Sequence, residues 1–71
     1  MRYFVIYKYP KDFPDDYVVR SFELDESGGV KIGPDFWRQD GLEAARRCIP
    51  EGLSCFAATK KDDPVIVETW L

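Results

Sequence analysis

The sequence predicts one small α+β domain spanning residues 1–71, in which a four-stranded, mostly antiparallel sheet of two hairpins carries one helix on one face. Two observations predict this class. Four short runs are rich in β-branched and aromatic residues, which favour strands. One segment between the second and third runs has the apolar spacing of a helix. The expected order is therefore β-β-α-β-β.

The first two runs predict an antiparallel hairpin. Residues 2–9 are almost all β-branched or aromatic, and Pro10 ends this run. Residues 11–16 form a polar connection. Residues 17–24 form the second strand, which the polar and glycine-rich residues 25–29 end. The two runs are close enough in sequence to pair directly.

The segment that follows gives a weaker pattern. Residues 30–32 are too few to define a strand beyond one edge pairing. The Gly-Pro-Asp sequence at 33–35 breaks the chain, and residues 36–38 predict a single turn.

A helix is predicted to begin at Asp40 and to end before Pro50. Asp40 and Glu43 have the spacing of a capping box, in which two side chains bind free amides at the helix start. An apolar stripe for packing is formed by Leu42, Ala45 and Ile49. Residues 53–58 and 65–70 then predict the second hairpin.

Composition argues against several classes of function. Ten basic and thirteen acidic side chains give a net charge of −3, which disfavours tight binding to nucleic acid. The chain has no histidine, the usual general base and the commonest metal ligand. We therefore expect a non-enzymatic protein with no metal site and no cofactor.

The two cysteines indicate a reducing compartment. The spacing of Cys48 and Cys55 fits neither a redox pair nor a zinc site, and both thiols are expected to be packed. The first eight residues lack the apolar stretch of a signal peptide, and no run is long enough to span a membrane. We therefore expect a cytoplasmic protein without membrane contact.

Alternation along the strands divides the sheet into two faces. If Glu23 and Glu68 remain in water, the helix covers Phe4, Ile6, Val18, Phe22, Leu24, Val65 and Val67. Arg20 contradicts this assignment unless its charged end reaches an edge.

One short helix covers only one face, so the other face is a candidate interaction surface. Its residues are Tyr3, Val5, Tyr7, Tyr9, Tyr17 and Trp70, together with Val19 and Ile66. Large exposed apolar surfaces mark partner sites, so we expect a homodimer or another bound protein. Alternatively, residues 27–39 fold back over this face, and the aromatic residues belong to a closed core.

A second candidate surface is basic. Trp37, Arg38, Arg46 and Arg47 are expected near one another if the turn before the helix folds back. Arginine beside aromatic rings binds single-stranded nucleic acid by stacking and by phosphate pairing. The acidic balance of the domain argues against this alternative.

Overall fold

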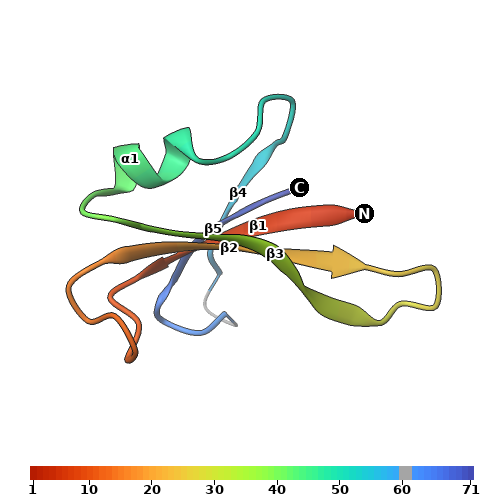
Figure 1. Cartoon of the computed structure of the whole chain (residues 1–71), viewed down its shortest axis with the longest axis horizontal. Coiled ribbons are helices and arrows are strands. Elements are labelled where there is room, and N and C mark those ends of the chain that lie inside the picture. Colours follow the sequence, from red (N-terminus) through yellow and green to blue (C-terminus); the bar gives the residue numbers. More distant parts are fainter. Residues whose placement is uncertain (60–61) are drawn as a thin grey trace.

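The computed structural model describes residues 1–59 and 62–71 and shows, within them, an antiparallel five-stranded sheet with one short helix on one face (Figure 1). The elements are β1 (Arg2–Lys8), β2 (Tyr17–Leu24), β3 (Val30–Gln39), α1 (Leu42–Arg47), β4 (Cys55–Ala57) and β5 (Ile66–Trp70). The strand order is β3-β2-β1-β5-β4. The predicted α+β class and antiparallel sheet are confirmed, whereas the predicted strand number and the β-β-α-β-β order are wrong because β3 is a full strand.

Both predicted hairpins are present. β1 pairs with β2 from Arg2 opposite Glu23 to Lys8 opposite Tyr17, and β4 pairs with β5. β1 ends at Lys8, two residues before the proline, because Tyr9 adopts a left-handed conformation with φ of 51°. The amide of Tyr9 donates to the Asp16 carbonyl at 2.9 Å, which closes the connection between the strands.

The strand that sequence analysis missed, β3, contains a bulge. Its register against β2 shifts between Arg20 and Phe22, so that the segment containing Gly33 and Asp35 lies opposite Ser21. A Cβ at Gly33 would collide with the Ser21 hydroxyl, and the Asp35 amide donates to that hydroxyl at 3.0 Å. The Gly-Pro-Asp sequence at 33–35, which was predicted to break the chain, is instead accommodated within the strand by this bulge. The alternative in which residues 27–39 cover the sheet is also wrong, because most of that segment is part of the sheet.

The helix begins differently from the prediction but packs as predicted. Its N-cap is Gly41, which makes no side-chain capping bond, so the proposed capping box is wrong. Glu43 instead accepts a hydrogen bond from Arg46 at 3.0 Å. The predicted stripe is confirmed: Ala45 is fully buried, and Leu42 and Ile49 pack against the same core.

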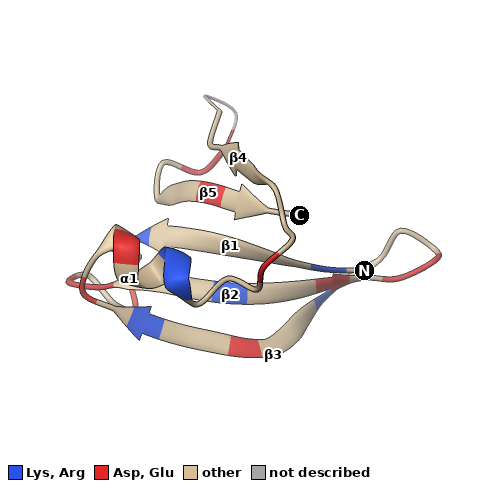
Figure 2. Cartoon of the chain, turned by 90° about the horizontal axis from the view of Figure 1, so that it is seen from above, with Lys and Arg blue, Asp and Glu red and all other residues tan. Residues whose placement is uncertain are grey.

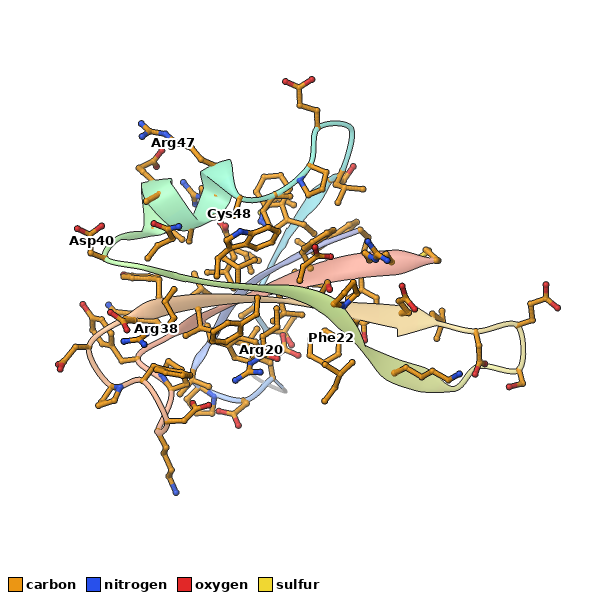
Figure 3. All side chains as sticks on the ribbon, viewed as in Figure 1. Arg20, Phe22, Arg38, Asp40, Arg47 and Cys48 are labelled. Carbon is orange, nitrogen blue, oxygen red and sulfur yellow. The ribbon has the colours of Figure 1, made fainter. Side chains whose placement is uncertain are left out.

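The core lies between α1 and the sheet and contains Phe4, Ile6, Val19 and Ala45. The predicted facing of β1 is therefore confirmed. That of β2 is wrong, because Val19 and Tyr17 pack on the helix side, whereas Val18, Phe22 and Leu24 follow the register to the opposite face. Figure 3 shows Phe22 on this opposite side of the sheet. Trp70 of β5 also packs against the helix-side core, which corrects its predicted position.

The helix covers only part of its face. Seen from above in Figure 2, α1 lies over one end of β1 and β2, while the turn joining β2 and β3 extends well beyond it. The hairpin formed by β2 and β3 therefore reaches past the core, and the candidate surfaces are determined by this arrangement.

Candidate interaction surface

A buried carboxylate joins the helix to the sheet. Glu68 of β5 is only 7% exposed, and its two oxygens accept hydrogen bonds from Arg46 Nε at 3.0 Å and Arg46 Nη2 at 2.6 Å. Trp70 Nε1 donates to the same carboxylate at 3.3 Å. The assumption that Glu68 stays in water was therefore wrong, because an arginine on α1 compensates its charge.

The chemistry of this cluster fits a structural role. Hydrogen bonding to Arg46 lowers the pKa of Glu68 below its usual value, so the carboxylate stays ionised. The pKa of the Cys55 thiol is raised, first by burial of the sulfur and then by its hydrogen bond with Glu68. A raised pKa leaves less of the thiolate form that a nucleophile needs. Residue Cys55 as a whole is exposed, contrary to the packed position predicted for it, whereas Cys48 is half-buried beside the core.

The opposite face of the sheet is covered near the connection between β1 and β2. This connection curls beneath the sheet in Figure 1, and on this face of the sheet Val5 and Val18 are only 6% and 0% exposed. Phe13 from this connection packs against Phe36 of β3 with ring centroids 5.6 Å apart. The part of this face formed by Val5 and Val18 therefore belongs to the folded interior.

Two arginines flank this aromatic pair. The Arg38 guanidinium lies 4.4 Å from the Phe13 ring centroid, and that of Arg20 lies 4.8 Å from Phe36. Each also forms an ion pair with the connection, Arg38 with Asp16 at 2.8 Å and Arg20 with Asp12 at 3.0 Å. Arg20 contradicted the predicted facing of its strand. In the structure it lies on the face without the helix (Figure 3), so its charged end is not buried beneath the helix.

The same face is apolar and exposed toward the β2–β3 turn. Cross-strand neighbours form a group that we call the hairpin patch: Tyr3, Phe22, Leu24, Val30, Ile32 and Phe36. Ile32 is 78% exposed, Val30 56%, Phe36 42% and Leu24 37%. The rings of Tyr3 and Phe22 stack at 5.5 Å and join the patch across β1 and β2. No member of the patch is charged.

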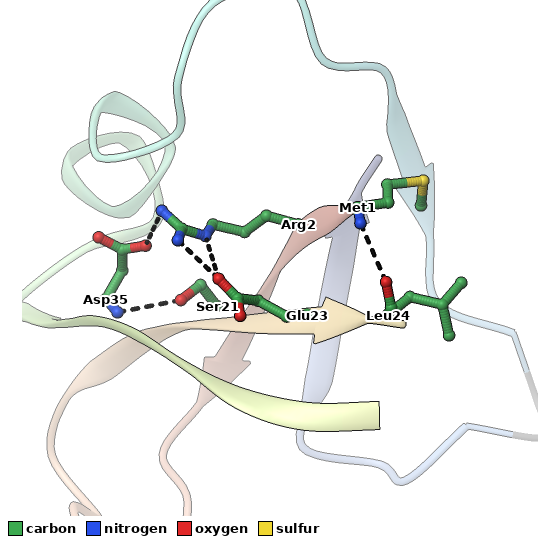
Figure 4. A network of polar contacts seen from close by, with 6 residues as sticks. All are labelled: Met1, Arg2, Ser21, Glu23, Leu24 and Asp35. Atoms are coloured by element: carbon green, nitrogen blue, oxygen red, sulfur yellow. Dashed lines mark hydrogen bonds and ion pairs between the residues drawn. The ribbon is translucent and has the colours of Figure 1, made fainter. Parts of the chain in front are cut away.

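The helix side of the same hairpin end is polar (Figure 4). Arg2 binds Glu23 at 2.6 Å and lies 3.4 Å from Asp35. The amino terminus donates to the Leu24 carbonyl at 3.0 Å. The projecting end of the sheet thus has one charged face, on which Arg2 is paired with Glu23 and Asp35, and one apolar face, which is exposed.

The residues predicted as one aromatic face are divided between the two sides. Tyr3, Val5 and Tyr7 lie on the face without the helix, as predicted, and burial raises the pKa of the Tyr7 hydroxyl. Tyr17 and Trp70 belong to the helix-side core. The exposed Tyr9 ring meets the edge of the Tyr17 ring at 5.5 Å.

The predicted basic surface does not form. Trp37 stacks on Phe4 at 6.4 Å in the core, and Arg46 is held by Glu68. Arg38 lies on the side of the sheet opposite Arg47, as Figure 3 shows. These four residues are therefore not brought together for stacking and phosphate pairing.

Sequence reasoning missed most of the hairpin patch. Phe22 and Leu24 were assigned to the wrong face, Val30 and Ile32 to no more than one edge pairing, and Phe36 to a turn. Two signals could have found them. The charge of Arg20 marks its face as the one without the helix, and Val30 and Ile32 alternate with Lys31 as on an edge strand.

The part of the chain that the structure describes has no helix long and apolar enough to cross a membrane, and no group of three or more potential metal-ligating side chains. In comparisons with known proteins, no family model matches the chain, and no significant similarity to a curated protein or to a solved structure is found. Function is therefore inferred from the surfaces of this chain.

Proposed function

We propose that this chain is a non-enzymatic protein-interaction module that binds a protein through the hairpin patch. The observation that carries the proposal is the concentration of exposed apolar side chains on one face of the projecting hairpin, of which Ile32 is the most exposed at 78%. Large apolar side chains that remain in water favour burial against a partner. Aromatic residues such as Phe22, Phe36 and Tyr3 supply much of the energy of such contacts.

We also propose that this protein is cytoplasmic. Cys48 and Cys55 are both free thiols, and neither lies in a site that would use its reactivity. Free cysteines persist in reducing compartments, which supports a cytoplasmic protein whose partner is met there.

The test is photo-crosslinking in the cells that naturally make the protein. A photoreactive amino acid replaces Ile32 in one variant and Arg47 in the control, because Arg47 is also exposed but lies on the helix side. We expect adducts of protein size from position 32 and none from position 47. Their absence at position 32, or equal yields at both positions, would show that the hairpin patch binds no protein.

A further inference from the structure

We infer that the partner of the hairpin patch is a second copy of this chain, and that the two copies pack face to face about a two-fold axis. This inference rests on the proposed function and names the partner in it. In such a dimer the same patch contributes from both copies, as a closed symmetric pair requires.

The exposed area agrees with such a pair. Taking about 200 Å² for a large side chain, the exposed fractions across the patch amount to roughly 500 Å² per copy. Two copies then bury about 1,000 Å², the size at which specific interfaces begin. A dimer of this size is expected to be weak and therefore to depend on concentration.

Charge also favours a second copy. The patch itself is uncharged, so two copies can meet without like charges facing each other, although each chain carries a net charge of −3. Arg20, whose guanidinium lies over the Phe36 ring, is already paired with Asp12 at 3.0 Å. Asp25 at the hairpin turn accepts hydrogen bonds from the Ser27 amide and from the Gly29 amide of its own turn. The patch therefore has no free charge to recognise a charged partner.

Pairing through the free edge of β3 is disfavoured by the bulge. Pro34 has no amide hydrogen to donate, and the amide of Asp35 is directed to Ser21 within the same chain. Bulges and prolines on edge strands prevent strand addition in natural sheets. Association through the face of the hairpin is therefore favoured over pairing through the edge of β3.

Face-to-face packing covers the apolar face that the hairpin of a single chain leaves exposed. A projecting two-stranded ribbon is only marginally stable unless its apolar face is packed. Each hairpin has one apolar face and one polar face. Two hairpins packed through their apolar faces form a small two-sheet sandwich, and the paired patches are its interior. The charged network of Arg2, Glu23 and Asp35 stays outside, in water (Figure 4).

The experiment is light scattering on the purified full chain, over concentrations from about 10 μM to 1 mM, because an interface of this size is expected to be weak. We expect the mass to rise from 8.3 kDa toward twice that value. Ile32→Glu should keep the monomer mass at every concentration. Phe56→Glu is the matched control, since it makes the same kind of change at an exposed strand residue outside the patch, and should still associate.

Folding is checked by circular dichroism, and a second measurement uses the unchanged chain. On dilution, amide NMR signals of residues 22–24 and 30–36 should shift, while those of α1 should not. A monomer at all concentrations overturns the dimer. So does association that survives Ile32→Glu or is lost with Phe56→Glu. If a monomeric chain still crosslinks another protein through position 32 in cells, the proposed function stands and only the second copy is wrong; if neither occurs, both are wrong.

Discussion

At the residue scale, the most informative side chain is Glu68. A buried carboxylate is costly unless it is paired and hydrogen-bonded, and here Arg46 and Trp70 both donate to it. Because Arg46 lies on α1 and Glu68 on β5, the pair connects elements that are far apart in sequence. We infer that it orients the short helix on the sheet, where six helical residues have little stability of their own.

The Glu68–Arg46 pair predicts a pH dependence of stability. The folded-state pKa of Glu68 is lowered, chiefly by its hydrogen bond from Arg46, so between that pKa and the usual value the unfolded chain binds more protons. The free energy of unfolding should therefore fall as the pH drops through about 4.5 toward the lowered pKa. Glu68→Gln should lose about 1 to 2 kcal/mol at pH 7, and less at lower pH.

Urea unfolding of both proteins at a series of pH values measures this effect. Glu23 and Asp25 also have lowered pKa values, from the Arg2 and Ser27 side chains respectively, and both remain in the variant. The difference between the two curves therefore isolates Glu68. A difference that stays constant from pH 7 to pH 3 would contradict the prediction.

Sequence reasoning worked for single residues where one physical rule acts alone. Ala45 was placed on the buried stripe because helical spacing determines it. Glu68 was misplaced because its position depends on a partner from another element, which spacing within one element does not show, and Asp40 was misplaced because the helix takes Gly41 as its N-cap. Glu68 found Arg46, whereas Asp40 gives no cap to the helix.

At the element scale, the connection between β1 and β2 acts as a cover. It places Phe13 against Phe36 and Arg38, while Asp12 and Asp16 bind the two arginines of the sheet. Sequence analysis expected only a polar loop. The apolar residue within it was the sign that it packs on the sheet.

Phe13→Ala tests this cover. Removing the ring deletes its contacts with Phe36 and Arg38, and we expect a loss of about 1 to 3 kcal/mol in the free energy of unfolding. Asp15→Ala is the control, because Asp15 lies in the same connection and is exposed. Urea unfolding compares the variants, and equal midpoints for both would show that the connection contributes no packing.

The hairpins were predictable because each pairs neighbours in the sequence, through alternating β-branched and aromatic residues. β3 was not, because its bulge at Gly33 and Asp35 fits Ser21 on another strand. The facing of β2 failed for a different reason. Both of its faces carry apolar residues, so the apolar pattern alone does not determine which residues face the helix, and the charge of Arg20 was the signal that did.

At the scale of the whole molecule, ion pairs lie on both faces of the sheet, whereas the hairpin patch lies on the face without the helix. The ion pairs of Arg2 and Arg46 are on the helix side, and those of Arg20 and Arg38 are on the opposite face. A chain of 71 residues has a small core, and oligomerisation often completes such a core. Stability and association should therefore be linked in this protein.

This linkage predicts that the thermal midpoint depends on concentration. Association through the patch removes folded monomer from the unfolding equilibrium, so the midpoint should rise as the chain concentration increases by about 100-fold. Sodium sulfate should raise the midpoint further, because it strengthens apolar burial. Added sodium chloride should have little effect on the concentration dependence, since the patch itself is uncharged.

Calorimetry at several concentrations measures this, with Ile32→Glu and Phe56→Glu as the pair of variants. Ile32→Glu should melt at one temperature whatever its concentration. Because its side chain is 78% exposed in the single chain, that temperature should equal the midpoint of the unchanged protein at high dilution. Phe56→Glu should keep the dependence. A midpoint of the unchanged protein that does not move with concentration would mean that each chain is already complete alone, and that its apolar hairpin contributes nothing to stability.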